Sequence, residues 1–169
     1  MIENEHSTAG ASQRFAVRWV FGAWSDSLRR ELVAFWLREG ALTSADEAWR
    51  RTFEVACVLE DVHTGKLAGV CTIGIHLDEQ QRSYGFVRIF IRRDDRMIGL
   101  GRRLMARMIE GFTALASEPG APQRLVATIE NRKLQRRGAQ RLLAQLGFAQ
   151  VGVAPNGELV MQRSLRPQA

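Results

Sequence analysis

A glycine-containing stretch between an expected strand and an expected helix is the part of this sequence best suited to bind a ligand. The stretch Arg96–Gly101 follows the strand-like run 86–91 and precedes the helix-like run 104–115. At such a junction the first backbone N–H groups of the helix lack partners within the helix and lie at its positive end, where they attract phosphate. Its two glycines permit close approach of a ligand, and Arg102 and Arg103 add positive charge. The stretch therefore predicts a phosphate or pyrophosphate site.

Length and composition indicate a soluble globular protein that is attracted to anions. The 169 residues are 46% hydrophobic and 25% charged, and the net charge is +6, which favours nucleotides, coenzymes or nucleic acid as partners. We expect one domain over residues 13–169, preceded by a flexible N-terminal arm at 1–12. No apolar run reaches the length of about 18 residues that a membrane span needs. The polar, acidic N-terminus does not resemble a signal peptide, so the expected location is the cytoplasm.

The cysteines do not indicate a metal site. Cys57 and Cys71 are 14 positions apart and have no histidine partner at metal-binding spacing, so a zinc site is not expected. They flank an expected hairpin symmetrically, and we expect two buried, reduced thiols on neighbouring strands. The sequence predicts no metal.

Hydrophobic periodicity gives an alternation of strands and helices that would position the glycine stretch. Ser25 or Asp26 can cap the first helix, and the capping-box sequence 44–47 opens the second. The expected elements are a strand at 15–20, helices after 25 and at 44–49, strands at 53–60, 67–76 and 84–91, a helix at 100–115, a strand at 125–129, a helix from Asn131 to Gly147, and a hairpin of 150–153 and 158–162. This order (β-α-α-β-β-β-α-β-α-β-β) predicts an α/β fold of the α+β type, with four helices and a mixed central sheet of six to seven strands.

The same order, with the glycine stretch after the fourth strand, resembles the GNAT acetyltransferase family. The cofactor motif of that family is Gln/Arg-x-x-Gly-x-Gly/Ala, which Arg96–Gly101 matches at each fixed position. A second family segment, an asparagine after the fifth strand and a helix ending in Gly-Phe, looks like Asn131 and Gly147-Phe148. The resemblance implies the GNAT fold over residues 15–163. It also implies direct transfer of an acetyl group from acetyl-CoA to an amine, without a metal.

The resemblance also implies where coenzyme A would bind. In the family, the glycine loop cradles the pyrophosphate, the fourth strand pairs with the pantetheine arm, and the fifth strand splays away from the fourth to admit the thioester. The residues of this sequence that correspond to such contacts are Ile91, Arg93, Arg96, Met97, Ile98, Gly99, Leu100, Gly101, Arg102, Arg103 and Asn131.

The acid and base that many family members use are absent from their usual positions. Leu143 stands where a tyrosine often protonates the departing thiolate, and the strand 84–91 contains no carboxylate. Tyr84 is a candidate acid, although an ordinary half-buried strand tyrosine explains it as well. Glu130 is a candidate base, directly or through water. It can equally be a charge that favours the helix start beside Asn131.

Two functions from different classes remain open. The first is an acyl-CoA-dependent N-acyltransferase acting on a small-molecule or peptide amine. The alternative is a non-catalytic GNAT-fold module that binds acyl-CoA or a protein. Family members are often dimers, so a homodimer is open. The basic helix after Asn131 lacks the interleaved aromatic residues that single-strand binders use, so nucleic acid is not favoured as a partner.

Two further groups of side chains are expected to have partners within the fold or to line a substrate pocket. Arg88 alternates with aromatic residues on one strand face and, if buried there, needs a partner. An aromatic group lies around the first two helices, where the family has its acceptor wall, and most of it is expected in the core. It consists of Trp24, Phe35, Trp36, Trp49 and Phe53.

Overall fold

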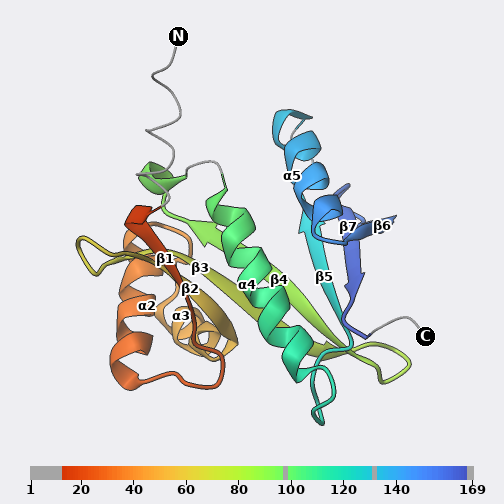
Figure 1. The fold of residues 1–169 in the computed structure, drawn as a ribbon, viewed down its shortest axis with the longest axis horizontal. Coiled ribbons are helices and arrows are strands. Elements are labelled where there is room, and N and C mark those ends of the chain that lie inside the picture. Colours follow the sequence, from red (N-terminus) through yellow and green to blue (C-terminus); the bar gives the residue numbers. More distant parts are fainter. Residues whose placement is uncertain (1–12, 97–98, 131–132, 167–169) are drawn as a thin grey trace. The chain divides into compact units, whose positions relative to one another are not determined.

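The structure is a computed structural model that describes residues 13–96, 99–130 and 133–166. Within them, seven strands and four α-helices follow one another in the order that the sequence predicts (Figure 1). The elements are β1 (Phe15–Trp19), α2 (Asp26–Arg38), α3 (Ala45–Arg51), the 3-10 helix η1 (Thr52–Glu54), β2 (Val55–Asp61), β3 (Leu67–Leu77), β4 (Ser83–Ile91), the 3-10 helix η2 (Arg93–Asp95), α4 (Leu100–Leu115), β5 (Arg124–Ile129), α5 (Lys133–Gln145), β6 (Ala149–Val153) and β7 (Leu159–Ser164).

The strands form a mixed seven-stranded sheet in the order β1-β2-β3-β4-β5-β7-β6. β1 and β2 are antiparallel, β4 and β5 are parallel, and β7 runs antiparallel to both β5 and β6. This confirms the predicted α+β class. The chain divides into two compact units, which are described separately: unit 1 comprises Met1–Cys71 and Ile89–Leu104, and unit 2 comprises Thr72–Arg88 and Met105–Ala169. The single domain over 13–169 stays a prediction, and the predicted arm at 1–12 lies outside the described residues.

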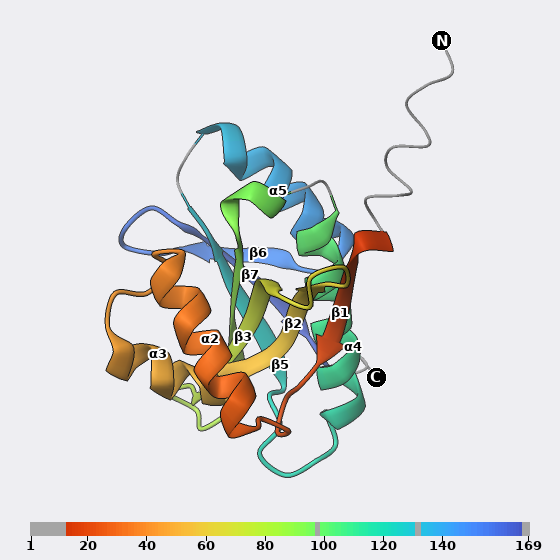
Figure 2. The same ribbon diagram turned by 90° about the vertical axis from the view of Figure 1, so that its left-hand side faces the viewer.

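Unit 1 packs two capped helices against its strands. The Ser25 side chain accepts a hydrogen bond from the Leu28 N–H group (3.1 Å), and Ser44 accepts one from Glu47 (3.2 Å), so both predicted N-caps are confirmed. Helices α2 and α3 lie side by side (Figure 2). The apolar face of α2 packs into a core with residues of α3, β2 and β3. Burying this face stabilises the helix far more than its intrinsic propensity does.

Unit 2 contains the parallel pairing of β4 with β5 and the remainder of α4. A Cβ atom at Gly85 of β4 would lie 2.8 Å from the Ile73 side chain and 3.2 Å from that of Leu125. Glycine is therefore required here because the side chains of β3 and β5 close over this point of β4. Met108 and Phe112 of α4 are fully buried, as their helical spacing predicts.

The expectations for Arg88 and for the two cysteines have different outcomes. Arg88 is exposed, with its guanidinium carbon 4.5 Å from the centre of the Phe86 ring, so the buried setting in which it was expected to need a partner does not occur. A long side chain at a strand position can turn its charged end to water and rest its stem on a ring. Cys57 and Cys71 are buried free thiols, as predicted, and burial raises the pKa of the Cys71 thiol.

Candidate functional site

The start of α4 has the geometry of an anion site. Gly99 has a φ of +93°, in the left-handed region that favours glycine. Neither glycine of the motif is crowded by a described residue: none lies within 4 Å of a Cβ atom placed at Gly99, and a Cβ atom at Gly101 would touch the Ile91 side chain alone among them, at 4.0 Å. The first described backbone bond of the helix runs from the Arg103 N–H group to the Gly99 carbonyl (3.0 Å). The N–H groups of Leu100 and Gly101 therefore precede the helical ladder, where an anion can accept from them.

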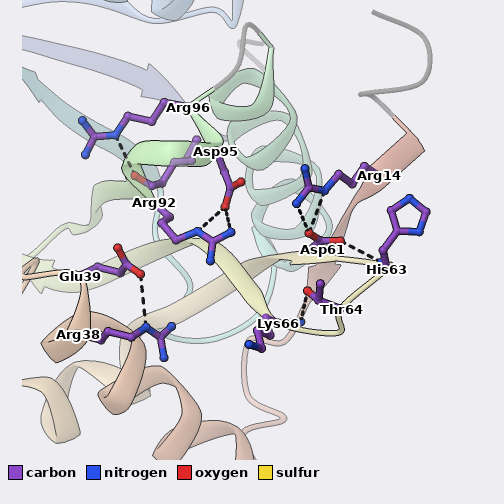
Figure 3. Close-up of polar contacts among 11 residues, drawn as sticks. Arg14, Arg38, Glu39, Asp61, His63, Thr64, Lys66, Arg92, Asp95 and Arg96 are labelled. Atoms are coloured by element: carbon purple, nitrogen blue, oxygen red, sulfur yellow. Dashed lines mark hydrogen bonds and ion pairs between the residues drawn. The ribbon is translucent and has the colours of Figure 1, made fainter. Parts of the chain in front are cut away.

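The turn that leads into this helix is fixed by polar contacts with β3 and β4. The Arg92 side chain forms an ion pair with the buried Asp95. The backbone N–H group of Arg92 donates to the Ala68 carbonyl of β3 (2.8 Å). Arg96 folds back so that its Nε donates to the Ile91 carbonyl (2.9 Å) (Figure 3). These contacts hold the segment from Arg92 to Arg96 against β3 and the end of β4.

Positive charge surrounds the same turn. Arg93, Arg96 and Arg102 are exposed there. Arg103 has a different role: its Nη2 donates to the Phe15 carbonyl of β1 (2.9 Å), which ties the first turn of α4 to the first strand. The three exposed guanidinium groups are accessible to a phosphate at the surface, whereas Arg103 anchors the first turn of α4.

The predicted cofactor residues are thus placed as follows. Ile91, Arg93, Arg96, Gly99, Leu100, Gly101, Arg102 and Arg103 all lie in unit 1, between the end of β4 and the first turn of α4. Leu100 itself is buried and anchors the helix by its side chain. Met97, Ile98 and Asn131 lie outside the described residues.

In unit 2, the ladder between β4 and β5 is short. It joins Tyr84–Phe86 to Arg124–Val126 and stops there, although both strands continue. Beyond this point β5 remains paired with β7 up to Ile129. The two parallel strands therefore separate after three residue pairs, which leaves backbone groups of Val87 and of the second half of β5 outside their shared ladder.

The candidate acid Tyr84 begins this ladder and is flanked by two side chains. The His76 ring lies 5.6 Å from the Tyr84 ring, and the Arg124 guanidinium carbon lies 5.2 Å from its centre. Arg124 also donates to Asp78 (3.0 Å). Asp78 accepts from the backbone and side chain of Arg82 and from Gln80, and these hydrogen bonds lower the pKa of its carboxyl group. Tyr84 is half-buried, and its ring lies beside a guanidinium that Asp78 holds in place.

The other candidate chemistry residues lie at the ends of β5 and α5. Glu130 is exposed and follows β5 directly. Leu143 is buried, and its carbonyl accepts from the Phe148 N–H group (2.9 Å) after Gly147 turns the chain with a φ of +86°. The position where many family members have a tyrosine is therefore an apolar core position here, with no acid to offer.

Sequence reasoning missed a buried cation among the aromatic residues of unit 1. The Arg29 guanidinium carbon lies 3.8 Å from the centres of both the Trp49 and the Phe53 ring, and Nε donates to Thr52 Oγ1 (2.8 Å). Arg29 is 8% exposed, whereas Trp49 and Phe53, which were expected mainly in the core, are 40% and 51% exposed. One signal was present: Arg29 directly follows Leu28 at the edge of the apolar stripe of α2. Phe35 and Trp36 are buried as expected.

Within the described ranges, no three His, Cys, Asp or Glu side chains are arranged to hold a metal ion. None of the described helices is both long enough and apolar enough to cross a membrane.

Comparison with known proteins identifies similar sequences and folds. The sequence profile described as "Acetyltransferase (GNAT) family" matches residues 21–148. No curated protein sequence matches this chain.

Among solved structures, a GNAT-family acetyltransferase from Streptococcus pneumoniae superimposes with a TM-score of 0.66 at 20% identity, covering 89% of this chain and 98% of that one. The putative acetyltransferase yncA from Salmonella typhimurium, with acetyl-CoA, gives 0.62 at 20% identity, covering 92% and 96%. A phosphinothricin acetyltransferase from Sinorhizobium meliloti, in complex with acetyl-CoA, gives 0.66 at 19% identity, covering 89% and 88%. At these identities the likeness establishes a shared fold.

Proposed function

Because the chain belongs to the Acetyltransferase (GNAT) family, we propose that it is an acyl-CoA-dependent N-acyltransferase that moves an acetyl group from acetyl-CoA to a primary amine. The observation that carries the proposal is the start of α4, where Gly99 adopts a positive φ and a Cβ atom at Gly101 would touch, among the described residues, the Ile91 side chain alone, at 4.0 Å. A cradle that a side chain would fill is what close approach of a pyrophosphate requires.

The cofactor contacts follow from this cradle. The N–H groups of Leu100 and Gly101 donate to the pyrophosphate, and the exposed cations Arg93, Arg96 and Arg102 pair with the coenzyme phosphates. The pantetheine arm runs along the end of β4. There the Ile91 carbonyl already accepts from Arg96, so the arm either uses the second lone pair of that oxygen or displaces the Arg96 side chain.

The transfer itself needs proton movement at two atoms. The amine nitrogen loses a proton and attacks the thioester carbon; the carbon–sulfur bond breaks, and the sulfur leaves as a thiolate that gains a proton. We assign the donation to Tyr84, whose ring lies 5.2 Å from the Arg124 guanidinium carbon in unit 2, because a positioned phenol can donate a proton to a departing thiolate. We assign the removal to Glu130, an exposed carboxylate that can act directly or through water.

The acceptor is proposed as the amine of a small molecule or of a peptide, and the location as the cytoplasm. A homodimer remains open, because β6 ends the strand order and leaves Val151 and Val153 more than half exposed. An edge strand of this kind invites pairing with another chain.

The second candidate function is a non-catalytic module that binds acyl-CoA. It is favoured by Leu143, which is buried at the position of the usual family acid, and by the absence of a carboxylate from the sequence of β4. This alternative keeps the cradle at α4 and predicts no turnover.

A thiol-release assay separates the two functions. The protein is incubated with acetyl-CoA and a panel of polyamines, amino acids and peptides, and free coenzyme A is measured against a blank without acceptor. Release of coenzyme A that depends on the acceptor, and that is slower in Tyr84→Phe and in Glu130→Gln, supports the acyltransferase function. Tight acetyl-CoA binding without release for any acceptor supports the non-catalytic module, and absence of binding refutes both.

A further inference from the structure

Unit 2 contains a cavity that the proposed acyl transfer does not use. Its volume is about 780 Å³, and it lies beside the start of β4, the last turn of α4 and the loop that connects α4 to β5. Sites for small molecules commonly have volumes of about 300–1,000 Å³. The cavity is therefore large enough for a small ligand.

One residue that lines this cavity carries a buried hydroxyl group for which the described residues offer no partner. Ser83 is 8% exposed, and its Oγ has no hydrogen-bond partner within the described part of the chain. Its backbone is fixed, because the Gln123 N–H group donates to the Ser83 carbonyl (3.0 Å), and Leu165 donates in turn to Gln123 (3.0 Å). A buried hydroxyl is unfavourable unless it forms a hydrogen bond. The Oγ atom is itself closed to solvent, so a ligand in the cavity reaches it when the Ser83 side chain rotates about χ1, and it then supplies the missing acceptor or donor.

The cavity is separate from the candidate acid. Ser83 and Tyr84 are neighbours on β4, so their side chains point to opposite faces of the strand. Tyr84 contacts His76 and Arg124, whereas Ser83 shares the cavity with Thr113 of α4. A ligand bound beside Ser83 therefore lies on the opposite face of β4 from Tyr84.

The side chains that line the cavity indicate the class of ligand. Its two ionisable residues, Glu118 and Arg166, have opposite charges, and both are exposed. The apolar part of the lining includes Leu77 and Leu165. A ligand that carries one ammonium and one carboxylate group matches this charge pattern, and an apolar substituent matches the two leucines.

We propose that this cavity binds a free α-amino acid with an apolar side chain. Arg166 pairs with its carboxylate, Glu118 pairs with its ammonium group, and Ser83 forms the buried hydrogen bond. The site does not depend on the proposed acyl transfer and adds an amino-acid-binding site to it.

The test is a titration with L-leucine, followed by calorimetry and by amide NMR spectra of the protein without acetyl-CoA. We expect the Ser83, Thr113 and Leu165 amide signals to shift. Ser83→Ala and Arg166→Gln should each weaken the affinity by about tenfold, the effect of one lost hydrogen bond or ion pair. Ser27→Ala, which changes an exposed serine of α2, should leave the affinity unchanged. Isocaproate and isoamylamine, which each lack one of the two charges, should bind more weakly than L-leucine.

Thermal unfolding without L-leucine tests whether the Ser83 hydroxyl lacks a partner in the free protein. Ser83→Ala should be at least as stable as the wild type, because it removes a hydroxyl that forms no bond in the free protein. A large loss of stability would mean that an ordered water or a protein group already satisfies this hydroxyl, which overturns the argument. Three other results would also overturn it. They are Ser83, Thr113 and Leu165 amide signals that do not shift, a Ser83→Ala variant that binds L-leucine with full affinity, and isocaproate that binds as tightly as L-leucine.

Discussion

Substitution of Gly101 should separate coenzyme binding from folding. Among the described residues, a Cβ atom at this position would meet only the Ile91 side chain, at 4.0 Å, so Gly101→Ala fits the free protein and the longer side chain of Gly101→Leu begins in the same space. Both replace glycine within helix α4, which raises helix stability by up to about 1 kcal/mol. Gly99→Ala is less informative, because its φ of +93° adds strain of about 1–2 kcal/mol to any effect on binding.

The expected loss of affinity follows from the N–H groups at the start of α4. A side chain at Gly101 occupies the open space that a pyrophosphate needs to reach the N–H groups of Leu100 and Gly101. Each hydrogen bond to a charged acceptor contributes about 1.5–3 kcal/mol. Loss of one to two of them amounts to about 2–4 kcal/mol, which raises the Kd roughly 30- to 1,000-fold. We expect Gly101→Ala at the lower end and Gly101→Leu at the upper end.

Calorimetric titration with acetyl-CoA at low salt measures this effect, with thermal unfolding of each variant in parallel. Gly138→Leu is the matched control, because Gly138 also lies in a helix and a Cβ atom there would meet no described residue within 4 Å. The control should bind acetyl-CoA as the wild type does. Wild-type affinity of Gly101→Leu for acetyl-CoA would refute the assignment of the pyrophosphate to this helix start. An equal loss of affinity in Gly101→Leu and in the control Gly138→Leu would refute it as well.

Three further predictions concern catalysis and stability. Tyr84→Phe and Glu130→Gln should each lower kcat by about 100-fold and leave the Kd for acetyl-CoA unchanged; unchanged turnover would remove that residue from the mechanism. Hydrogen bonds from Arg14 lower the pKa of Asp61, so its contribution to stability is present above the ordinary aspartate value of about 3.9 and is lost as the pH falls through the folded-state value. Asp61→Asn should therefore lower the Tm at neutral pH but much less near pH ~2, and a difference that is independent of pH would contradict this. Arg29→Ala should lower the free energy of unfolding by about 2–3 kcal/mol, because the Arg29 guanidinium packs against two rings. Chemical denaturation measures this difference, and a loss of less than about 0.5 kcal/mol would contradict the packing role.

The order of elements was predictable because local signals and tertiary packing agree in this chain. Ser25 and Ser44 cap the helices that their positions predict. The glycine motif lies at the strand-to-helix junction where it was expected, since the positive φ of Gly99 is a local backbone requirement. Such signals act over a few residues and can be read from the sequence.

The features that sequence reasoning missed depend on contacts between distant residues. Arg29 is buried because Trp49 and Phe53 close over it from α3 and η1, and its place beside the apolar stripe of α2 does not specify these two contacts. The exposure of Arg88 depends on its guanidinium lying along the Phe86 ring rather than entering the core. Similarly, Ser83 reads as an ordinary strand residue until the surrounding loops leave its hydroxyl without a partner.

The most direct test of the central claim is a crystal structure of the protein with acetyl-CoA. We predict that pyrophosphate oxygens accept hydrogen bonds from the N–H groups of Leu100 and Gly101 at the start of α4, with the pantetheine arm beside the end of β4. A pyrophosphate bound at any other place, with the start of α4 left to water, would contradict the proposed cofactor site.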